Sequence, residues 1–427
     1  MRKILILLYF LLLASHFSLL QAQPIRDEIL GNLQCSAGMM MAYPLPVQHK
    51  LTPAPEGKEP FYISHYGRHG SCYLTKAVTC EFPYKTLSHA DSLGKLTPLG
   101  REVLNRLNRI YRGARDRWGE LTEKGATEQR EIMNRMVERF PEVFADLADI
   151  DARSTGHNAC ILSMEYAMMQ LSMMRPKLKI HHNATRRDMS YLGQQAIKMD
   201  SVARADFDDF SRRYKNSNRL ERLLFSEASY LSPLISHVFN DCMFKIAGNL
   251  QNTTMSNWLT LYDLFADEEI YDYWERENAR IYCTYGPYLF TSHISDFTSQ
   301  LSLLRKIIEQ ADNSIQQKRP SASLRWGQET SLLPLVCLLD INKYGEAIDN
   351  LGSLGRRNWC DYKISPMSGN IQLVFYRKDL EDKDVLVKVL LNENEATLPL
   401  ETDIAPYYHW QEVRAYFLNK LDAYGKR

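Results

Sequence analysis

The sequence has almost no excess of charge of either sign. Its 427 residues include 52 Lys and Arg against 51 Asp and Glu, which gives a formal net charge of +1. A dedicated nucleic-acid-binding protein usually carries a basic excess, so this balance argues against that class while allowing a local basic pocket. Hydrophobic residues make up 45% and charged residues 24% of the chain, which is the balance of a soluble globular protein.

Long hydrophobic runs are missing beyond the N-terminus. Arg2 and Lys3 precede an apolar run over residues 4–14, and the small residue Ala22 follows. This pattern predicts a signal peptide over residues 1–22, cleaved after Ala22. The alternative, a membrane anchor, is disfavoured because the run is short and His16 interrupts its extension. We therefore expect a periplasmic or secreted protein that has no membrane association after cleavage.

Cysteine pairs with the spacing of a zinc site are also missing. The eight cysteines are Cys35, Cys72, Cys80, Cys160, Cys242, Cys283, Cys337 and Cys360. We predict no bound metal and no other cofactor. The sequence does not show which cysteines pair with each other, but Cys72 and Cys80 lie at the two ends of a short segment that a disulfide could close into a loop. In an exported protein we expect these two to form a disulfide, with Cα atoms within about 7 Å of each other.

The stretch from Phe61 to Cys72 reads FYISHYGRHGSC and is the most informative part of the chain. Residues 61–63 have the β-branched and aromatic composition of a strand. Arg68 and His69 then follow between two glycines, which permit close approach of the backbone to a ligand. An arginine can fork onto phosphate oxygens, and a histidine can act as base or nucleophile. Alone, the same pattern also fits an ordinary loop histidine.

Periodicity and capping residues predict the remaining elements. The predicted helices are residues 100–111, 125–140 and 162–174, a helix after Thr330, and residues 410–423. A short strand is predicted to begin at Asp149 and to run into a polar loop at 153–155. The other predicted strands are residues 178–180, 322–326, 370–377 and 384–392. The last two strands suggest a hairpin. Residues 23–60 are rich in proline, and we expect them to be irregular.

A long helical stretch divides the chain. Residues 199–317 contain no alternating runs, and their many charges are typical of a solvated helical surface. Strands and helices alternate on both sides of this stretch, which predicts an α/β protein. We therefore divide the mature chain into an α/β core, residues 23–198 and 318–427, and an inserted all-helical lobe, residues 199–317.

Four stretches could each form a loop at a strand end, where α/β sheets hold their ligands. They are Arg68-His69-Gly70, Leu121-Thr122-Glu123-Lys124-Gly125, Arg153-Ser154-Thr155 with Ser163, and Trp326-Gly327-Gln328-Glu329-Thr330. In their order and spacing, from about residue 60 to residue 420, the sequence resembles the histidine acid phosphatase family, branch two of the histidine phosphatase clan. The resemblance is strongest to phytase-like and multiple inositol polyphosphate phosphatase members. Residues 366–373 are also similar to bacterial members.

The resemblance implies a central mixed sheet flanked by helices, and a metal-free, two-step hydrolysis of phosphomonoesters. Phytate, an inositol polyphosphate, is among the substrates it implies. His69 would be the nucleophile that forms a phosphohistidine, and Glu329 would donate a proton to the leaving oxygen. Arg68, Arg153 and Gln328 would bind the phosphate. The expected partner is a phosphorylated small molecule.

Three positions depart from the family pattern. Cys72 and Ala159 stand where the family has arginines, and Gln328 stands where it has a histidine. One lost preorganised donor can lower a rate by about 10²–10³, and an arginine at a transferring phosphoryl group by about 10³–10⁵. An alternative interpretation is therefore a pseudophosphatase that binds a phosphorylated ligand or a protein partner. A third one, a sugar-phosphate mutase, is disfavoured by the export signal and the helical insert.

The helical insert makes a further prediction. If it covers the sheet, basic side chains from it should face His69, because a highly phosphorylated substrate needs several cations. The candidates are Arg186, Arg187 and the arginines of residues 199–317.

Overall fold

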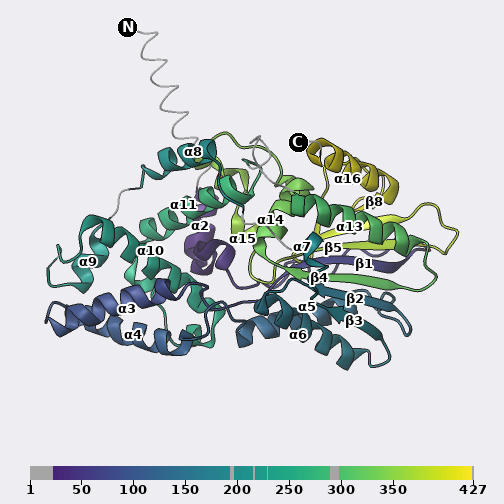
Figure 1. The fold of residues 1–427 in the computed structure, drawn as a ribbon. Helices are drawn as coiled ribbons and strands as arrows, with labels where there is room; N and C mark the ends of the chain where they lie inside the picture. Colours follow the sequence, from purple (N-terminus) through teal and green to yellow (C-terminus); the bar gives the residue numbers. More distant parts are fainter. Residues whose placement is uncertain (1–22, 193–196, 215–216, 228, 289–297, 426–427) are drawn as a thin grey trace, which may run out of the picture.

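The computed structural model describes residues 23–192, 197–214, 217–227, 229–288 and 298–425. The predicted signal peptide lies outside these residues and stays a prediction. None of the helices in these ranges combines the length and the hydrophobicity that a membrane span requires. Figure 1 shows a twisted sheet with helices on both of its faces, next to a group of helices that lacks strands.

The sheet has eight strands. They are β1 (Glu59–Arg68), β2 (Asp149–Ser154), β3 (Lys179–Asn183), β4 (Ser321–Gly327), β5 (Asn370–Arg377), β6 (Leu386–Leu391), β7 (Asn394–Ala396) and β8 (Tyr407–His409). Their order is β3-β2-β4-β1-β5-β6-β7, and β8 pairs with β6. The strands β1, β2, β3 and β4 run parallel, whereas β5 is antiparallel to both β1 and β6. The predicted mixed sheet and the predicted β5–β6 hairpin are confirmed.

Helices cover both faces of the sheet. Ile63 on β1 lies in a core with α5 (Glu123–Arg139) and α6 (Asn158–Met174). Its neighbour Tyr62 lies in a different core, with α13 (Thr298–Ile315), α14 (Glu329–Leu338) and α16 (Trp410–Gly425). Successive residues of a strand point to opposite faces, so β1 is buried from both sides. This arrangement is the predicted α/β class.

Most of the remaining helices contribute to a core of their own. These are α3 (Ala77–Ser92), α4 (Pro98–Ala114), α9 (Arg219–Leu224), α10 (Pro233–Asn249) and α11 (Asp267–Tyr285). The helix α8 (Ser201–Ser211) instead packs into the core that contains α13. Here α3 packs against α10, although α3 precedes the predicted insert, whereas α13 contacts α16 and the short α7 (Met189–Leu192) beside the sheet. The boundaries 199–317 of a helical lobe stay a prediction.

The expectation that residues 23–60 are irregular is wrong for their first part. This part forms α2 (Gln23–Gly31) and the 3-10 segment η1 (Leu33–Met40). Ile29 and Cys35 are buried in the helical core, and the Asn32 side chain accepts a hydrogen bond from the backbone N–H of Gln34 at 3.2 Å. Burial therefore orders a segment whose composition is that of a loop.

Short segments complete the fold. They are η2 (Leu250–Asn252), η3 (Thr254–Asn257), η4 (Tyr262–Leu264), η5 (Ile341–Lys343), η6 (Leu351–Ser353), η7 (Gly355–Arg357) and α15 (Asp361–Ile364). Both η1 and α15 contact α11, and they approach the end of β1 from the helical side.

Candidate active site

The predicted loops meet at the carboxyl ends of β1, β4 and β2. Arg68 lies opposite Gly327 in the β1–β4 pair, and Ser154 lies opposite Trp326 in the β2–β4 pair. The backbone N–H of His69 donates to the carbonyl oxygen of Gly327 at 3.0 Å. Since parallel strands end at one edge of a sheet, the motif at Arg68 and the motif at Glu329 become neighbours there.

The loop after β1 lies directly on the start of α5. A Cβ atom on Gly70 would lie 2.5 Å from the carbonyl oxygen of Gly125, and one on Gly125 would lie 2.3 Å from that of Ser71. Thr122 caps α5 by accepting from the N–H of Gly125 at 3.1 Å, and its hydroxyl donates to the carbonyl of Ser71 at 3.0 Å. Only glycine fits at these two backbone contacts.

We expect Gly125→Ala to lower the free energy of unfolding by about 1–3 kcal/mol, because the added methyl group meets backbone atoms that cannot move independently. The control is Gly156→Ala, since a Cβ atom on Gly156 has no neighbour within 4 Å. Chemical denaturation of both variants measures the difference. Equal stability of the two variants would contradict the close contact.

The imidazole of His69 is oriented by one hydrogen bond. Its Nδ1 lies 2.9 Å from the carbonyl oxygen of Gly70, which can only accept, so Nδ1 carries a hydrogen. Its Nε2 lies 3.7 Å from Oε2 of Glu329. His69 is 7% exposed, so its imidazole has little contact with solvent. This arrangement leaves Nε2 as the reactive atom.

Glu329 lies between the two groups that would hold a phosphate. Its Oε2 lies 3.1 Å from Nε of Arg68. Burial raises the pKa of the Glu329 carboxyl, but Arg68 and His69 outweigh burial and hold this pKa well below its usual range. Burial lowers the pKa of His69, whereas Cys72 and the Glu329 carboxylate raise it, with a net increase. The carboxylate thus occupies the place of an anionic ligand.

The Arg68 guanidinium is held from the protein side. Its Nη1 donates to the carbonyl oxygens of Met39 at 2.5 Å and of Ser365 at 2.9 Å. Met39 belongs to η1, and Ser365 directly follows α15. These contacts leave the Nε side of the guanidinium facing Glu329, so the cation is fixed before any ligand arrives.

The other two predicted phosphate ligands are placed differently. Gln328 is the N-cap residue of α14, without a side-chain cap bond. Arg153 donates from Nε to Oδ1 of Asp151 at 2.8 Å, and its Nη1 lies 3.8 Å from Oδ2 of Asp188. The guanidinium of Arg153 is thus bound by carboxylates of its own neighbourhood, and its role at a phosphate stays a prediction.

The predicted disulfide between Cys72 and Cys80 is wrong. Both cysteines are free and buried. Cys72 is close enough to His69 to raise the pKa of the imidazole, whereas Cys80 lies in the core of the helical part. The loop that separates them leads from the end of β1 into α3, and it directs the two side chains to different environments.

The neighbourhood of Ala159 is apolar. Ala159, at the start of α6, forms a small buried cluster with Leu121 and Ala126. A methyl group thus fills the place where the family has an arginine. Cys72 is likewise only 4% exposed.

Two buried residues that the sequence did not single out hold the motif loops together. The carboxylate of Glu128 accepts from the N–H of Ser71 at 2.9 Å and from the hydroxyl of Ser368 at 2.8 Å. The side chain of Gln129 donates to the carbonyl oxygen of Arg68 at 3.2 Å and accepts from the indole of Trp326 at 2.8 Å. Both lie on α5, where their polar character on a buried face was the available signal.

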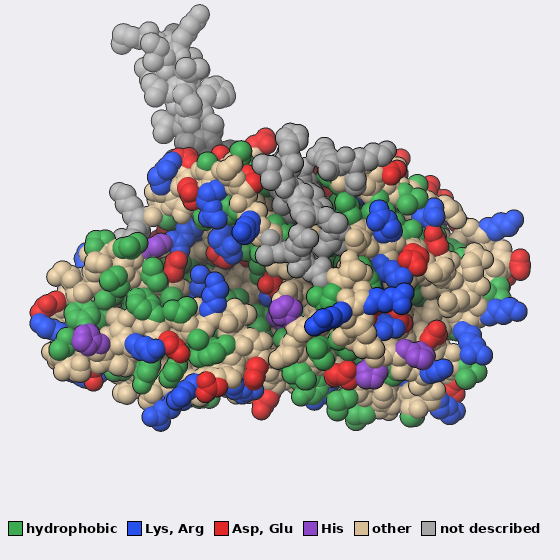
Figure 2. All heavy atoms as spheres, in the orientation of Figure 1, with side chains coloured by type: hydrophobic (Ala, Val, Ile, Leu, Met, Phe, Trp, Pro, Cys, Tyr) green, Lys and Arg blue, Asp and Glu red, His purple; other side chains and the backbone are tan. Residues whose placement is uncertain are grey.

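A cavity of about 320 Å³ opens beside Arg68 and Glu329. Its basic lining residues are Arg68, Lys76, Lys245, Arg276 and Arg280. In Figure 2, Lys and Arg side chains surround a hollow near the middle of the visible face. Since α10 and α11 supply three of these residues, the prediction that the insert brings basic side chains to the site agrees with the lining. Arg186 and Arg187 do not line this cavity in the described structure.

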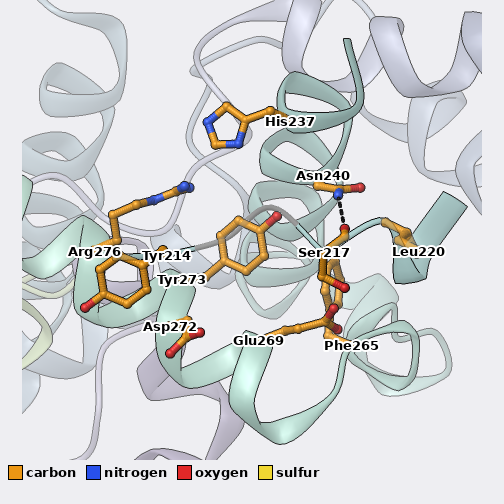
Figure 3. A pocket seen from close by; sticks show the side chains of 10 residues that line it. All are labelled: Tyr214, Ser217, Leu220, His237, Asn240, Phe265, Glu269, Asp272, Tyr273 and Arg276. Atoms are coloured by element: carbon orange, nitrogen blue, oxygen red, sulfur yellow. Dashed lines mark hydrogen bonds between the residues drawn. The ribbon is translucent and has the colours of Figure 1, made fainter. Parts of the chain in front are cut away.

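A second cavity lies within the helical part (Figure 3). It shares Tyr273 and Arg276 with the first, and Asn240 beside it donates to the carbonyl oxygen of Ser217 at 3.2 Å. Its volume is about 60 Å³, which is room for a few water molecules but not for a phosphorylated sugar. No cluster of three or more His, Cys, Asp or Glu side chains within the described ranges is arranged to hold a metal ion.

Comparisons with known proteins identify the fold. No protein-family model and no curated sequence matches the chain. Among solved structures, the multiple inositol polyphosphate phosphatase of Bifidobacterium longum in complex with phosphate is similar, with a TM-score of 0.71 and 16% identity over 90% of this chain and 97% of that chain. The phytase of D. castellii has a TM-score of 0.67 and 12% identity over 91% and 85% of the two chains. The chain thus has the fold of histidine acid phosphatases.

Proposed function

We propose that this protein is an exported phosphomonoester hydrolase that works through a phosphohistidine on His69. The observation that supports this most directly is the geometry of His69 Nε2, which lies beside Arg68 and Glu329 with Nδ1 bound to the carbonyl of Gly70. The proposed substrates are phosphorylated small molecules, inositol phosphates among them. The phosphatase fold and the cavity beside Arg68 support the proposal.

One proton must lie on His69 in the absence of a ligand but on Glu329 when the reaction begins. The raised pKa of His69 and the lowered pKa of Glu329 place one proton on the imidazole and leave the carboxylate ionised. A phosphate dianion competes with this carboxylate for Arg68. Once displaced, Glu329 loses the contact that holds its pKa low, and it takes up the proton that the nucleophile must give up. The pair then holds a neutral imidazole and a protonated acid.

Two displacements follow. The lone pair of His69 Nε2 forms a bond to phosphorus, the ester P–O bond breaks, and Glu329 gives its proton to the leaving oxygen. A water molecule then attacks phosphorus, the P–N bond breaks, and the Glu329 carboxylate accepts a proton from that water. Arg68 binds the phosphoryl oxygens in both steps, which supplies the charge stabilisation on which phosphoryl transfer mainly depends.

An activity assay tests the proposal. Purified mature protein is incubated with a set of phosphomonoesters in the presence of a metal chelator, and released phosphate is measured. We expect turnover of at least one alkyl phosphate. Complete inactivity towards all of them, with the protein folded, would contradict the proposal.

The role of Glu329 predicts a dependence on the leaving group. Glu329→Gln keeps the size of the side chain but removes the transferable proton, so kcat/KM for alkyl phosphates should fall by about 10²–10⁴. A nitrophenyl phosphate leaves without much help from an acid and should lose far less. Steady-state kinetics with both substrates measure the contrast. An equal loss for both would assign Glu329 to binding alone.

A second candidate function is that of a pseudophosphatase that binds a phosphorylated ligand or a protein. It is favoured by the buried Cys72 and by the apolar cluster at Ala159, which supply no positive charge where the family has arginines. Under this alternative, phosphate binds beside Arg68 but is not released from any ester.

A further inference from the structure

The cavity beside the proposed active site carries almost as many acidic as basic side chains. Next to five basic residues it is lined by four acidic ones. These are Asp241, Glu277, Glu329 and Asp361. The acidic residues come from α10, α11, α14 and α15, so four different helices each contribute one. A cavity for a strongly anionic ligand would instead carry unopposed cations.

Most of the basic residues are already paired. Arg276 forms a salt bridge with Asp241 across α10 and α11, and its guanidinium also lies over the ring of Tyr273 at 5.2 Å. Arg280 binds Glu277 through two hydrogen bonds, of 2.9 and 2.6 Å. Two parallel hydrogen bonds to one carboxylate are the strongest pairing that an arginine makes.

The pair of Arg280 and Glu277 is ionised in the folded protein. Burial raises the pKa of Glu277, but Arg280 and Lys245 outweigh it and leave this pKa below its usual value. Arg280 in turn has a raised pKa because of Glu277, against the effect of burial. A ligand phosphate would therefore approach fixed negative charges as well as positive ones.

Two lysines differ from the arginines. Lys76 and Lys245 are exposed, and neither forms a salt bridge within the part of the chain that the structure describes. Exposed lysines bind a phosphate weakly, since pairs of this kind contribute about 0–1 kcal/mol. They can hold one additional phosphate group beside the one at Arg68, but not a shell of several.

We propose, on the basis of the proposed function, that this cavity selects phosphomonoesters with one or two phosphates on a hydroxylated body and rejects fully phosphorylated inositol. Each phosphate group carries about −1.5 to −2 charges at pH 7. Six such groups cannot be matched by two free lysines and Arg68. The carboxylates of Asp241 and Glu277 repel additional phosphates, whereas they accept hydrogen bonds from hydroxyl groups of a sugar or polyol.

The test compares two substrates of the full mature protein, a sugar monophosphate and inositol hexakisphosphate. We expect kcat/KM to favour the monophosphate by about tenfold or more. The variant Asp241→Asn with Glu277→Gln should move this ratio towards the hexakisphosphate by at least tenfold, because one carboxylate acting on one unit of ligand charge at roughly 10 Å, in a medium of effective dielectric constant 20, already accounts for about tenfold. The matched control is Glu102→Gln with Asp263→Asn, which removes two carboxylates around Arg106 outside the cavity.

The outcomes separate the two proposals. If the wild type prefers the hexakisphosphate, this inference is overturned and the proposed function stays intact. The same conclusion follows if the control variant shifts the kcat/KM ratio as much as the cavity variant does. If the cavity variant does not fold, inhibition of the wild type by inorganic phosphate and by inositol hexasulfate decides, and tighter inhibition by the hexasulfate overturns the inference. If no ester is turned over, the proposed function fails. Calorimetry then tests the cavity alone, by measuring the binding of inorganic phosphate and of inositol hexasulfate to the wild type. We again expect inorganic phosphate to bind more tightly.

Discussion

Replacement of His69 by alanine is expected to reduce turnover of every phosphomonoester to background. The imidazole is the proposed nucleophile, and its Nε2 lies 3.7 Å from Oε2 of Glu329, which in turn lies 3.1 Å from Nε of Arg68. Released phosphate, measured over long incubations with wild type and variant, checks the prediction.

Two controls sharpen the result. His157→Ala removes an exposed imidazole at the N-cap of α6, where it makes no side-chain cap bond, and should leave turnover unchanged. Cys72→Ser retains a small polar group beside His69 and should keep measurable activity. Activity that survives His69→Ala but disappears in Cys72→Ser would move the nucleophile from the imidazole to the thiol.

Replacement of Arg68 by lysine is expected to lower kcat by about 10³-fold or more, the loss seen when an arginine is removed from a transferring phosphoryl group. A lysine keeps the charge, but it cannot hold Met39 and Ser365 and at the same time present a planar fork to the phosphate. Steady-state kinetics with a single alkyl phosphate measure the loss, and a change of less than tenfold would contradict the role of Arg68.

The matched variant is Arg153→Lys. The sequence predicts that Arg153 binds phosphate, whereas the structure pairs it with Asp151 and Asp188. We therefore expect a small loss of activity in this variant. A loss as large as that of Arg68→Lys would restore Arg153 as a phosphate ligand and would require it to leave Asp151 when substrate binds.

The sequence predicted the parts of the fold that depend on local patterns. The strand 370–377 coincides with β5, because its residues are buried on both faces and bounded by turn residues. The predicted helices 100–111 and 125–140 lie within α4 and α5 except for Phe140, and the side chains of Thr97 and Thr122 cap the starts of these two helices. The segment α2–η1 was missed, since its order comes from burial against α10 and α11 rather than from its own composition.

The candidate site was likewise predicted only in part from the sequence. Arg68, His69 and Glu329 were predicted from motifs that resemble those of histidine acid phosphatases, and the structure places Glu329 within 4 Å of both Arg68 and His69. Basic side chains from residues 199–317 were predicted to face the site, but the sequence did not show which ones line the cavity or that carboxylates pair with them. Arg276, Glu277 and Arg280 gain their meaning only when α11 is packed beside the end of β1, and a sequence pattern does not contain that contact.

The most direct measurement is the capture of the covalent intermediate. The protein is mixed with an excess of a nitrophenyl phosphate, quenched within a single turnover under alkaline conditions, digested and analysed by mass spectrometry. We expect one phosphoryl group on the peptide that contains His69, none in the His69→Ala protein, and accumulation of this species in Glu329→Gln, where attack by water lacks its base. Release of phosphate with no phosphorylated peptide, or a phosphoryl group on a different residue, would contradict His69 as the nucleophile.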